Sequence, residues 1–443
     1  MALKWLYPGL KLKRWLVLVT LGLFLLVTGL TIIFDVTIWA FAEKAVSWFI
    51  LHTLGSPLLG GLLVSGLGLA LIVFGIQRLA SALIQVLRPG NSGNLWQLFY
   101  RRQYLAKGPR LVAIGGGTGL SVLLRGLKSY SHNLTAIVTV ADDGGSSGRL
   151  RQELNIPPPG DIRNCLVALA DTEKLMEDLF NYRFRQGEGL VGHNLGNLLL
   201  AAMIDMVGDL DQAIQEMARV LAIGGRVIPS TTSQVVLGAE MADGSFVYGE
   251  SSIPAAGKRI KRVFLQPEDC RPPAAALEAI ANADAVIIGP GSLYTSIMPN
   301  LLVRELAEAV RSTKAPVFYV ANIMTQPGET DGYTVADHLQ AIIDHCGPGM
   351  VDTVIAHNGP ISRAARHRYS EKGARPVMIN RPALAKMGVK LCQSWLVDES
   401  LLVRHHSDRL AALIMEQVYQ YHLHSWRPQK LLYFFHKKFS SLN

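Results

Sequence analysis

The sequence predicts an α/β protein with a Rossmann-like, largely parallel sheet flanked by helices. Short β-rich runs alternate with helical patterns between residues 110 and 425, and each run ends in a polar or glycine-rich turn. Five runs are predicted as strands: LVAI at 111–114, LTAIVTV at 134–140, AVIIG at 285–289, VFYV at 317–320 and TVIAH at 353–357. Because the carboxyl ends of parallel strands share one edge, the five turns should line a single crevice, the expected ligand site.

A small antiparallel β insertion is expected between residues 226 and 265. Polar and apolar residues alternate there, and Asp243-Gly244 forms a dipeptide typical of a hairpin turn. The insertion is interpreted as a lid or as a partner surface.

Two long apolar stretches precede this domain and predict a membrane hairpin over residues 1–87. Residues 15–34 and 58–76 are stretches of 20 and 19 residues without a charge, close to the ~20 residues that an apolar helix needs to cross a bilayer. Basic residues flank both stretches, which places both flanks in the cytoplasm. The expected location is therefore the inner (plasma) membrane, multi-pass, with the main domain cytoplasmic. A cleaved signal peptide and a pair of buried soluble helices are the alternative interpretations.

The charge distribution follows the same division. Residues 1–110 carry 11 Lys and Arg against 2 Asp and Glu, a net charge of +9 that equals the charge of the whole chain. The remaining residues are neutral as a group, which disfavours nucleic-acid binding. Residues 88–109 are predicted to be a juxtamembrane linker, 110–425 the α/β domain and 426–443 a basic-aromatic tail. The four cysteines lie far apart without a C-x-x-C pair and are expected to be reduced core residues.

The first glycine-rich turn follows the first predicted strand and is the strongest candidate for a phosphate contact. Glycines have no Cβ, so the turn can aim backbone N–H groups at an anion, and the helical pattern that follows adds a positive dipole end. A tight strand-to-helix connection without a ligand is the alternative. The candidate nucleotide-binding residues here are Gly115, Gly116, Gly117, Thr118 and Gly119.

The second turn, ADDGGSSGR, places two adjacent carboxylates, Asp142 and Asp143, at a strand end. Mg²⁺ prefers oxygen ligands and bridges to substrate phosphates, so these residues, with Ser146 and Ser147, suit a metal or ribose site. Helix capping or an Asx turn is the alternative. In PPPGDIRN, Asp161 is a third tentative Mg²⁺ ligand, with capping of the following helix as its alternative.

Three further motifs add candidate polar groups to the site. GHNLGN opens a long apolar helix, where amide side chains can contact a base or sugar and a histidine can act as an acid, a base or a hydrogen-bond donor; a structural histidine is the alternative. The candidates are His193, Asn194 and Asn197. The turns GPGSLYTS and ANIMTQPGET contribute Gly289, Gly291, Ser292 and Asn322.

In this order, IGGGTGLS, ADDGGSSGRLR, PPGDIRN, GHNLGNLLL, IIGPGSLYTSIMPNL and ANIMTQPGET resemble the YvcK/CofD-like family. The resemblance covers roughly residues 110–360, and it favours the YvcK branch, also called gluconeogenesis factors. It implies binding of a uridine-diphosphate sugar and a role in cell shape and gluconeogenic growth. The CofD branch implies a Mg²⁺-dependent 2-phospho-L-lactate transferase that acts on a guanosine dinucleotide and a deazaflavin alcohol.

Two functions therefore stay open. The first is a membrane-tethered regulator whose cytoplasmic domain binds a UDP-sugar and reports on cell-envelope synthesis. The second is a CofD-like transferase of phosphorus-containing groups, in which Mg²⁺ is held by the carboxylates. No catalytic residue is assigned, and whether the chain is an enzyme stays undecided. Beyond the membrane hairpin, the expected partners are the nucleotide, an envelope-synthesis protein and further copies of the chain.

Overall fold

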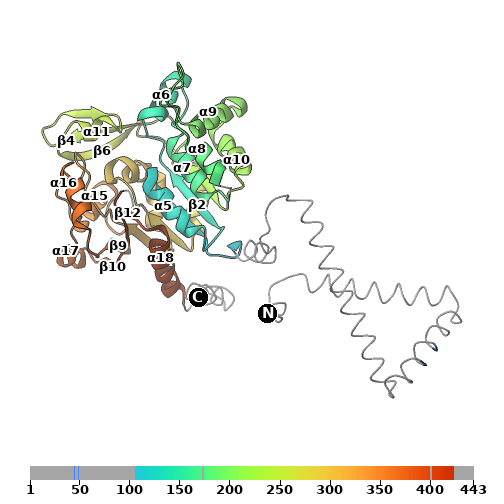
Figure 1. The fold of residues 1–443 in the computed structure, drawn as a ribbon. Coiled ribbons are helices and arrows are strands. Elements are labelled where there is room, and N and C mark those ends of the chain that lie inside the picture. Colours follow the sequence, from blue (N-terminus) through green and yellow to red (C-terminus); the bar gives the residue numbers. More distant parts are fainter. Residues whose placement is uncertain (1–43, 45–47, 49–104, 172–173, 400–401, 424–443) are drawn as a thin grey trace. The chain divides into compact units, whose positions relative to one another are not determined.

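Seven parallel strands form the central sheet of the computed structural model, in the order β3-β2-β1-β7-β8-β9-β10 (Figure 1). Such strands are buried on both faces and therefore read as nearly continuous apolar runs, which explains why five of them were predicted correctly. Their bounds are β1 Leu111–Gly115, β2 Leu134–Val138, β3 Arg226–Pro229, β7 Ala285–Ile288, β8 Val317–Val320, β9 Thr353–His357 and β10 Lys390–Ser394.

The structure describes residues 44, 48, 105–171, 174–399 and 402–423. The chain divides into two units, Met1–Asn94 and Leu95–Asn443, and the description here concerns the second. The two apolar stretches 15–34 and 58–76, the tail 426–443 and most of the linker 88–109 lie outside the described residues.

The predicted location in the plasma membrane is corrected. Among the described residues, every helix is either too short or too polar to cross a bilayer.

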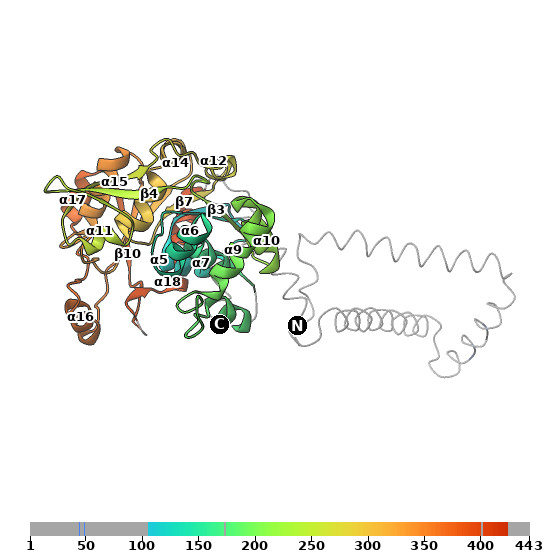
Figure 2. The ribbon, with the colours of Figure 1, turned by 90° about the horizontal axis from the view of Figure 1, so that it is seen from above.

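Helices cover both faces of the sheet. In Figure 2, α5, α7 and α18 lie on one side of the sheet and α12, α14 and α15 on the other, and α5 packs against both α7 and α18. The helices are α5 Gly117–Leu127, α6 Gly145–Leu154, α7 Gly160–Leu169, α8 Lys174–Asn181, α9 Leu195–Val207, α10 Leu210–Val220, α11 Ser252–Ala255, α12 Ala274–Ala281, the π-helix η2 Leu293–Ile297, α13 Met298–Leu301, α14 Arg304–Ser312, α15 Val335–Cys346, α16 Arg363–Ser370, α17 Arg381–Lys386 and α18 Ser407–His422.

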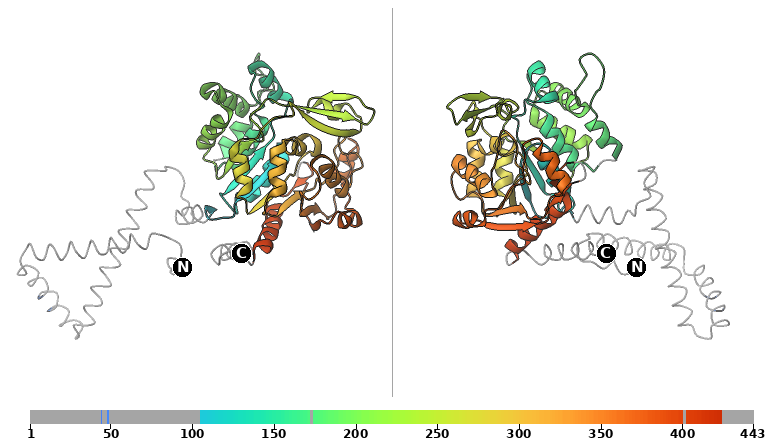
Figure 3. Two further views of the ribbon diagram at one scale, coloured as in Figure 1. Left: turned by 180° about the vertical axis from the view of Figure 1, so that it is seen from behind. Right: turned by 60° about the vertical axis from the view of Figure 1, so that its left-hand side comes forward.

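The β insertion is confirmed, but it begins later than predicted. Residues Arg226–Pro229 pair in parallel with β2 and close the central sheet as β3. The insertion proper consists of β4 Val236–Met241, β5 Phe246–Tyr248 and β6 Ile260–Gln266, an antiparallel sheet in the order β5-β4-β6 that projects beside the domain (Figure 3). Gly244 has φ +83°, which a glycine adopts readily at the β4–β5 turn.

Two hydrophobic cores stabilise the domain. The large core is built from both faces of the central sheet and its helices. A small, separate core lies under the C-terminal two-stranded sheet, β11 Val397–Asp398 and β12 Arg404–His405, and consists of Ile323, Met324, Ile361, Ala365, Val397 and Val403. Of the four free cysteines, three are buried and Cys392 is half-buried.

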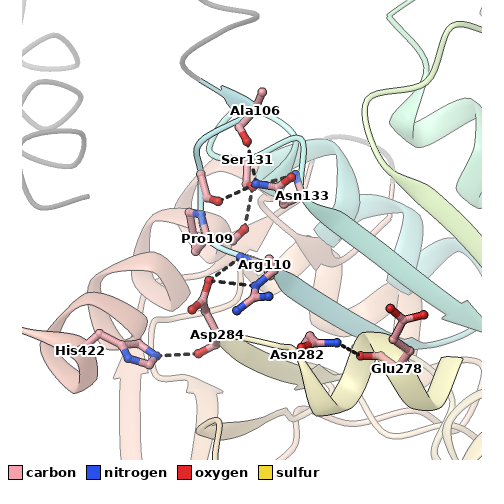
Figure 4. A network of polar contacts seen from close by, with 10 residues as sticks. Ala106, Pro109, Arg110, Ser131, Asn133, Glu278, Asn282, Asp284 and His422 are labelled. Atoms are coloured by element: carbon pink, nitrogen blue, oxygen red, sulfur yellow. Dashed lines mark hydrogen bonds and ion pairs between the residues drawn. The ribbon is translucent and has the colours of Figure 1, made fainter. Parts of the chain in front are cut away.

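Polar contacts anchor the start of the domain at the amino ends of the strands (Figure 4). Asn133 donates from Nδ2 to the carbonyls of Ala106 and Gly108, at 2.9 and 2.7 Å. The backbone N–H of Arg110 donates to Oδ2 of Asp284 at 2.8 Å. His422, near the end of α18, hydrogen-bonds the carbonyl of the same Asp284 at 2.7 Å. The first and last described elements of the domain therefore meet at Asp284, just before β7.

Asp284→Ala should destabilise the chain, because the backbone N–H of Arg110 loses its carboxylate acceptor in a nearly buried site. We expect the free energy of unfolding in urea to fall by about 1–2 kcal/mol. The control is Asn282→Ala, an exposed neighbour whose side chain donates to the carbonyl of Glu278 in the preceding helix. It should change stability by less than about 0.5 kcal/mol. Equal losses in both variants would contradict the proposed anchor.

Candidate functional site

The candidate site lies where the order of the strands reverses direction. From β1 the chain builds β2 and β3 on one side, then returns to place β7 on the other side of β1. The connections that leave the carboxyl ends of β1 and β7 therefore diverge. In open α/β sheets a crevice forms at such a switch point, and it is the usual place for a ligand. Both predicted glycine turns lie at this point.

The two glycine turns pack directly against each other. A Cβ atom on Gly119 would lie 2.5 Å from the carbonyl oxygen of Pro290. Asn300 is fully buried and donates from Nδ2 to the carbonyls of Gly115 and Ser296, at 3.1 and 2.8 Å. Packing alone thus accounts for Gly119, as the ligand-free alternative proposed.

Gly117 differs from its neighbours. It has φ +62°, and the nearest atom to a Cβ placed there is Oγ of Ser296 at 3.7 Å. Gly117 is also the first residue of α5, and Gly116 before it provides no side-chain cap. The helix has no acidic residue in its first turn. The first turn of α5 therefore lines the crevice with the positive end of a helix, which suits a phosphate. The carboxylate of Asp161, from α7, already accepts from the backbone of Gly117 at this end.

A cavity of about 380 Å³ occupies the crevice. Its near wall is the pair of glycine turns, and its far wall comes from the segment after β8, from α16 and from the C-terminal strand β12. The lining residues are Gly116, Gly117, Thr118, Gly119, Val122, Pro290, Gly291, Ser292, Ser296, Asn322, Ile323, Met324, Thr325, Gln326, Tyr369, Leu402, Val403, Arg404 and His405.

A larger hollow of about 760 Å³ lies at the opposite edge of the sheet, near the amino ends of β7 and β8, between α12 and α14. It contains neither a glycine turn nor the open end of a helix with buried polar groups beside it. We therefore assign the ligand site to the crevice and not to the larger hollow.

Asp161 connects the first glycine turn to a buried polar network. It is 8% exposed, and its carboxylate accepts a hydrogen bond from the backbone of Gly117. Burial, and then the charge of Asp142, raise the pKa of Asp161 to about 7. Asp161 lies in the first turn of α7 without capping it. The capping alternative is therefore wrong for Asp161.

Ser146 is the centre of the network beside Asp161. Its Oγ lies 3.1 Å from Nδ1 of His193, accepts from the backbone N–H of Asn194 at 3.2 Å and from Nδ2 of Asn197 at 3.3 Å. Asn197 Nδ2 also reaches Oγ of Ser147 at 3.5 Å. Asn194 caps α9 through a bond to the N–H of Asn197, at 3.2 Å. The structure thus brings the ADDGGSSGR and GHNLGN motifs together.

The adjacent carboxylates Asp142 and Asp143 have separate roles. Asp142 forms an Asx turn with the N–H of Gly144 at 2.9 Å, and burial raises its pKa. Asp143 instead accepts from the backbone N–H and the hydroxyl of Ser251, at 2.9 and 2.7 Å, and so holds the β insertion. Asp142 therefore faces Asp161, whereas Asp143 acts as a tether.

Two further buried carboxyls lie near these residues. Burial, and then the charges of Asp142, Asp161 and the neighbouring acids, raise the pKa of Glu250 to about 10, and its Oε2 has no partner among the described residues. Burial raises the pKa of Glu329 to about 7. Within the described ranges, no three metal-ligating side chains group closely enough to hold an ion. The expected Mg²⁺ site at Asp142, Asp143 and Asp161 is therefore not a preformed cluster.

The family model described as 2-phospho-L-lactate transferase CofD matches residues 111–397. The chain belongs to the CofD family. The gluconeogenesis factor of Halalkalibacterium halodurans is 53% identical over 70% of this chain and 97% of its own length. The gluconeogenesis factor of Bacillus subtilis is 51% identical over 70% of this chain and 98% of its own length. A crystal structure of a UPF0052 family protein from Bacillus halodurans matches with a TM-score of 0.68 and 53% identity, and covers 70% of this chain and 99% of that chain.

Most candidate residues of this CofD-family chain lie in or beside the cavity. Gly116, Gly117, Thr118, Gly119, Gly291, Ser292 and Asn322 line it. Gly115 and Gly289 lie at the strand ends, and the Ser146 network lies behind Asp161. Sequence analysis missed Glu250, Glu329, Tyr369, Arg404 and His405. Glu329 belongs to the quoted motif ANIMTQPGET but was not singled out there. The other four come from segments without a motif assigned to the site.

The raised pKa of Asp161 makes the stability of the chain depend on pH. An acid with a higher pKa in the folded state binds protons more readily there, so its stabilising contribution is present at low pH and is lost as the pH rises from 3.8 to about 7. Asp161→Asn should remove this loss, which is worth up to about 4 kcal/mol. Urea unfolding of both proteins between pH 4 and 8 measures the difference. Parallel pH profiles would contradict a buried, proton-binding Asp161.

Proposed function

We propose that this CofD-family chain binds a uridine-diphosphate sugar in the cavity between the two glycine turns and acts as a regulator. It would regulate cell-envelope synthesis, cell shape and growth on gluconeogenic carbon. The name gluconeogenesis factor, carried by relatives about half identical to this chain over nearly their whole length, supports a regulatory role. An envelope-synthesis protein and further copies of the chain are the proposed partners.

The observation that carries the proposal is the open N-terminus of α5 at the switch point of the sheet. Gly117 leaves room for an anion, and α5 has no acidic residue of its own in the first turn. Asp161 lies at the same helix end, but its pKa is raised to about 7, so its negative charge opposes an anion less than that of an ordinary carboxylate. Arg404 lines the opposite wall and is exposed, so its guanidinium can neutralise a diphosphate. The remaining walls carry amides, hydroxyls and apolar side chains that suit a nucleoside and a sugar.

A CofD-like transferase is the second candidate, and the neighbouring carboxyls of Asp142 and Asp161 favour it. Burial raises the pKa of both carboxyls, and the charge of Asp142 raises the pKa of Asp161 further. A divalent cation would relieve the cost of ionising them. Two carboxylates with the oxygens of a bound diphosphate would suffice for Mg²⁺, which keeps several non-protein ligands. When bound, the ion would neutralise charge on the transferred group.

Arg404→Gln should weaken binding of UDP-sugars to the full chain about tenfold or more, because a charge-assisted contact to the diphosphate is lost. Isothermal titration calorimetry with UDP-glucose measures the change. Arg366→Gln, an exposed position on α16 outside the cavity, is the matched control and should bind as the wild type does. Identical affinities for the wild type and both variants would exclude this cavity as the diphosphate site.

Turnover separates the regulator from the enzyme. With the full chain, Mg²⁺ and UDP-glucose, we expect the nucleotide sugar to be recovered unchanged, and a guanosine dinucleotide with a hydroxyl acceptor to release no GMP. Asp142→Asn should then leave UDP-glucose affinity within about threefold of wild type, since its Asx turn keeps an acceptor oxygen. Mg²⁺-dependent release of GMP that Asp142→Asn abolishes would instead establish the transferase.

A further inference from the structure

The larger hollow between α12 and α14 exposes apolar surface. Its apolar lining consists of Leu277, Ala281, Ala283, Ala309 and Ala315. Ala281 is exposed, and Leu277, Ala283 and Ala309 are half-buried. The volume of about 760 Å³ falls within the range of about 300–1,000 Å³ that is usual for binding pockets. Small side chains on the two helices therefore leave a depression that larger apolar side chains can fill.

The charged part of the lining is mainly acidic. Glu305 and Glu308 line the hollow from α14, together with a single lysine, Lys314. The two glutamates form ion pairs with Arg271 at 3.8 Å and with Arg304 at 2.9 Å, and neither arginine lines the hollow. Because all four side chains are largely exposed, these pairs contribute little free energy. The lining therefore favours a basic partner.

The last described helix ends at this hollow. His422, in the last turn of α18, lines it and hydrogen-bonds the carbonyl of Asp284 at 2.7 Å (Figure 4). Tyr421 donates from its hydroxyl to the carbonyl of Lys314 at 3.4 Å. Tyr421 and Leu423 are 59% and 46% exposed, which adds apolar surface at the end of α18. The tail 426–443 begins three residues after Leu423.

The tail has the composition that complements the hollow. Its 18 residues include five aromatic residues and four Lys or Arg, without any Asp or Glu, and residues 431–435 read LLYFF. An extended chain of 18 residues spans ~60 Å. The nine residues of α14, which form one side of the hollow, span only ~14 Å. The tail is therefore long enough to reach the hollow and to cross it.

We propose that the tail 426–443 binds in the larger hollow of its own chain, with aromatic side chains against the alanines and basic residues beside Glu305 and Glu308. The chain leaves α18 at the hollow, which gives the tail a high effective concentration there. Ala283 lines the hollow and precedes Asp284, where Arg110 and His422 meet. The bound tail thus secures the contact between the first and last described elements of the domain. This inference does not depend on the nucleotide site, which lies at the opposite edge of the sheet.

Hydrogen–deuterium exchange of the full chain and of a chain that lacks residues 426–443 tests the proposal. Exchange in α12 and α14 should be at least about fivefold faster without the tail, because a bound segment stabilises the closed state of the helices that it contacts. The tail added as a synthetic peptide should restore the protection. Unchanged exchange in both helices of the shortened chain would overturn the proposal.

Charge reversal tests the electrostatic part of the contact. Glu308→Lys in the shortened chain should weaken binding of the labelled tail peptide about fivefold, measured by fluorescence anisotropy. A peptide with Lys437→Glu and Lys438→Glu should recover most of this loss. Glu371→Lys is the matched control, since Glu371 is an exposed carboxylate in a similar helical ion pair at the end of α16. It should change binding less than twofold, and an equal loss in both variants would contradict a specific contact.

The same substitution in the full chain keeps the test independent of whether the shortened chain folds. There, Glu308→Lys should speed exchange in α12, which carries no substitution, and Glu371→Lys should not. Protection of α12 that rises with protein concentration would assign the hollow to the tail of a second copy. Tail-dependent co-sedimentation with vesicles of phosphatidylglycerol and phosphatidylethanolamine, with exchange in α12 and α14 indifferent to the tail, would assign the tail to a lipid surface. Either result would overturn the proposal.

Discussion

The contact between the two glycine turns determines where every other group in the cavity lies. Gly119 lies so close to Pro290 that no side chain fits between the turns, and the buried amide of Asn300 joins the end of β1 to η2. The turns are therefore part of the packed core and not mobile loops. A phosphate site built on such turns is formed before the ligand arrives, which lowers the entropic cost of binding.

The same close packing forces carboxyl groups out of water. Asp161 reaches the backbone of Gly117 only by being buried, and Glu250 and Glu329 are buried nearby, so each has a raised pKa. At neutral pH the site therefore holds fewer negative charges than its composition suggests. This matters for an anionic ligand, because ionised carboxylates at these three residues and at Asp142, whose pKa is also raised, would repel a diphosphate. Burial of these carboxyls therefore lowers the electrostatic repulsion that a diphosphate would meet at the proposed site.

The sequence predicted the sheet well because buried parallel strands are apolar throughout. The two edge strands, β3 and β10, were not among the predicted strands, because they are less buried. Arg226 begins β3 as an exposed residue, and most of β10 is half-buried. In the site, local motifs predicted the glycine turns and the Ser146 network. The adjacent residues Asp142 and Asp143 were predicted to share one site, but neighbouring residues after a strand point in different directions. Only tertiary contacts reveal that Asp143 holds Ser251.

The two walls of the cavity belong to different cores, and this division has a functional consequence. The glycine turns are built on the large core, whereas the far wall is supported by the small cluster around Ile323 and Val403. Backbone N–H groups recognise phosphates regardless of what is attached to them, so in the proposed nucleotide site the near wall would not distinguish one base or sugar from another. Specificity would then come from the far wall, whose side chains can change without disturbing the sheet. A fold of this kind can keep one binding site and exchange its function, so the match of this chain to a transferase family model and its identity to gluconeogenesis factors do not conflict.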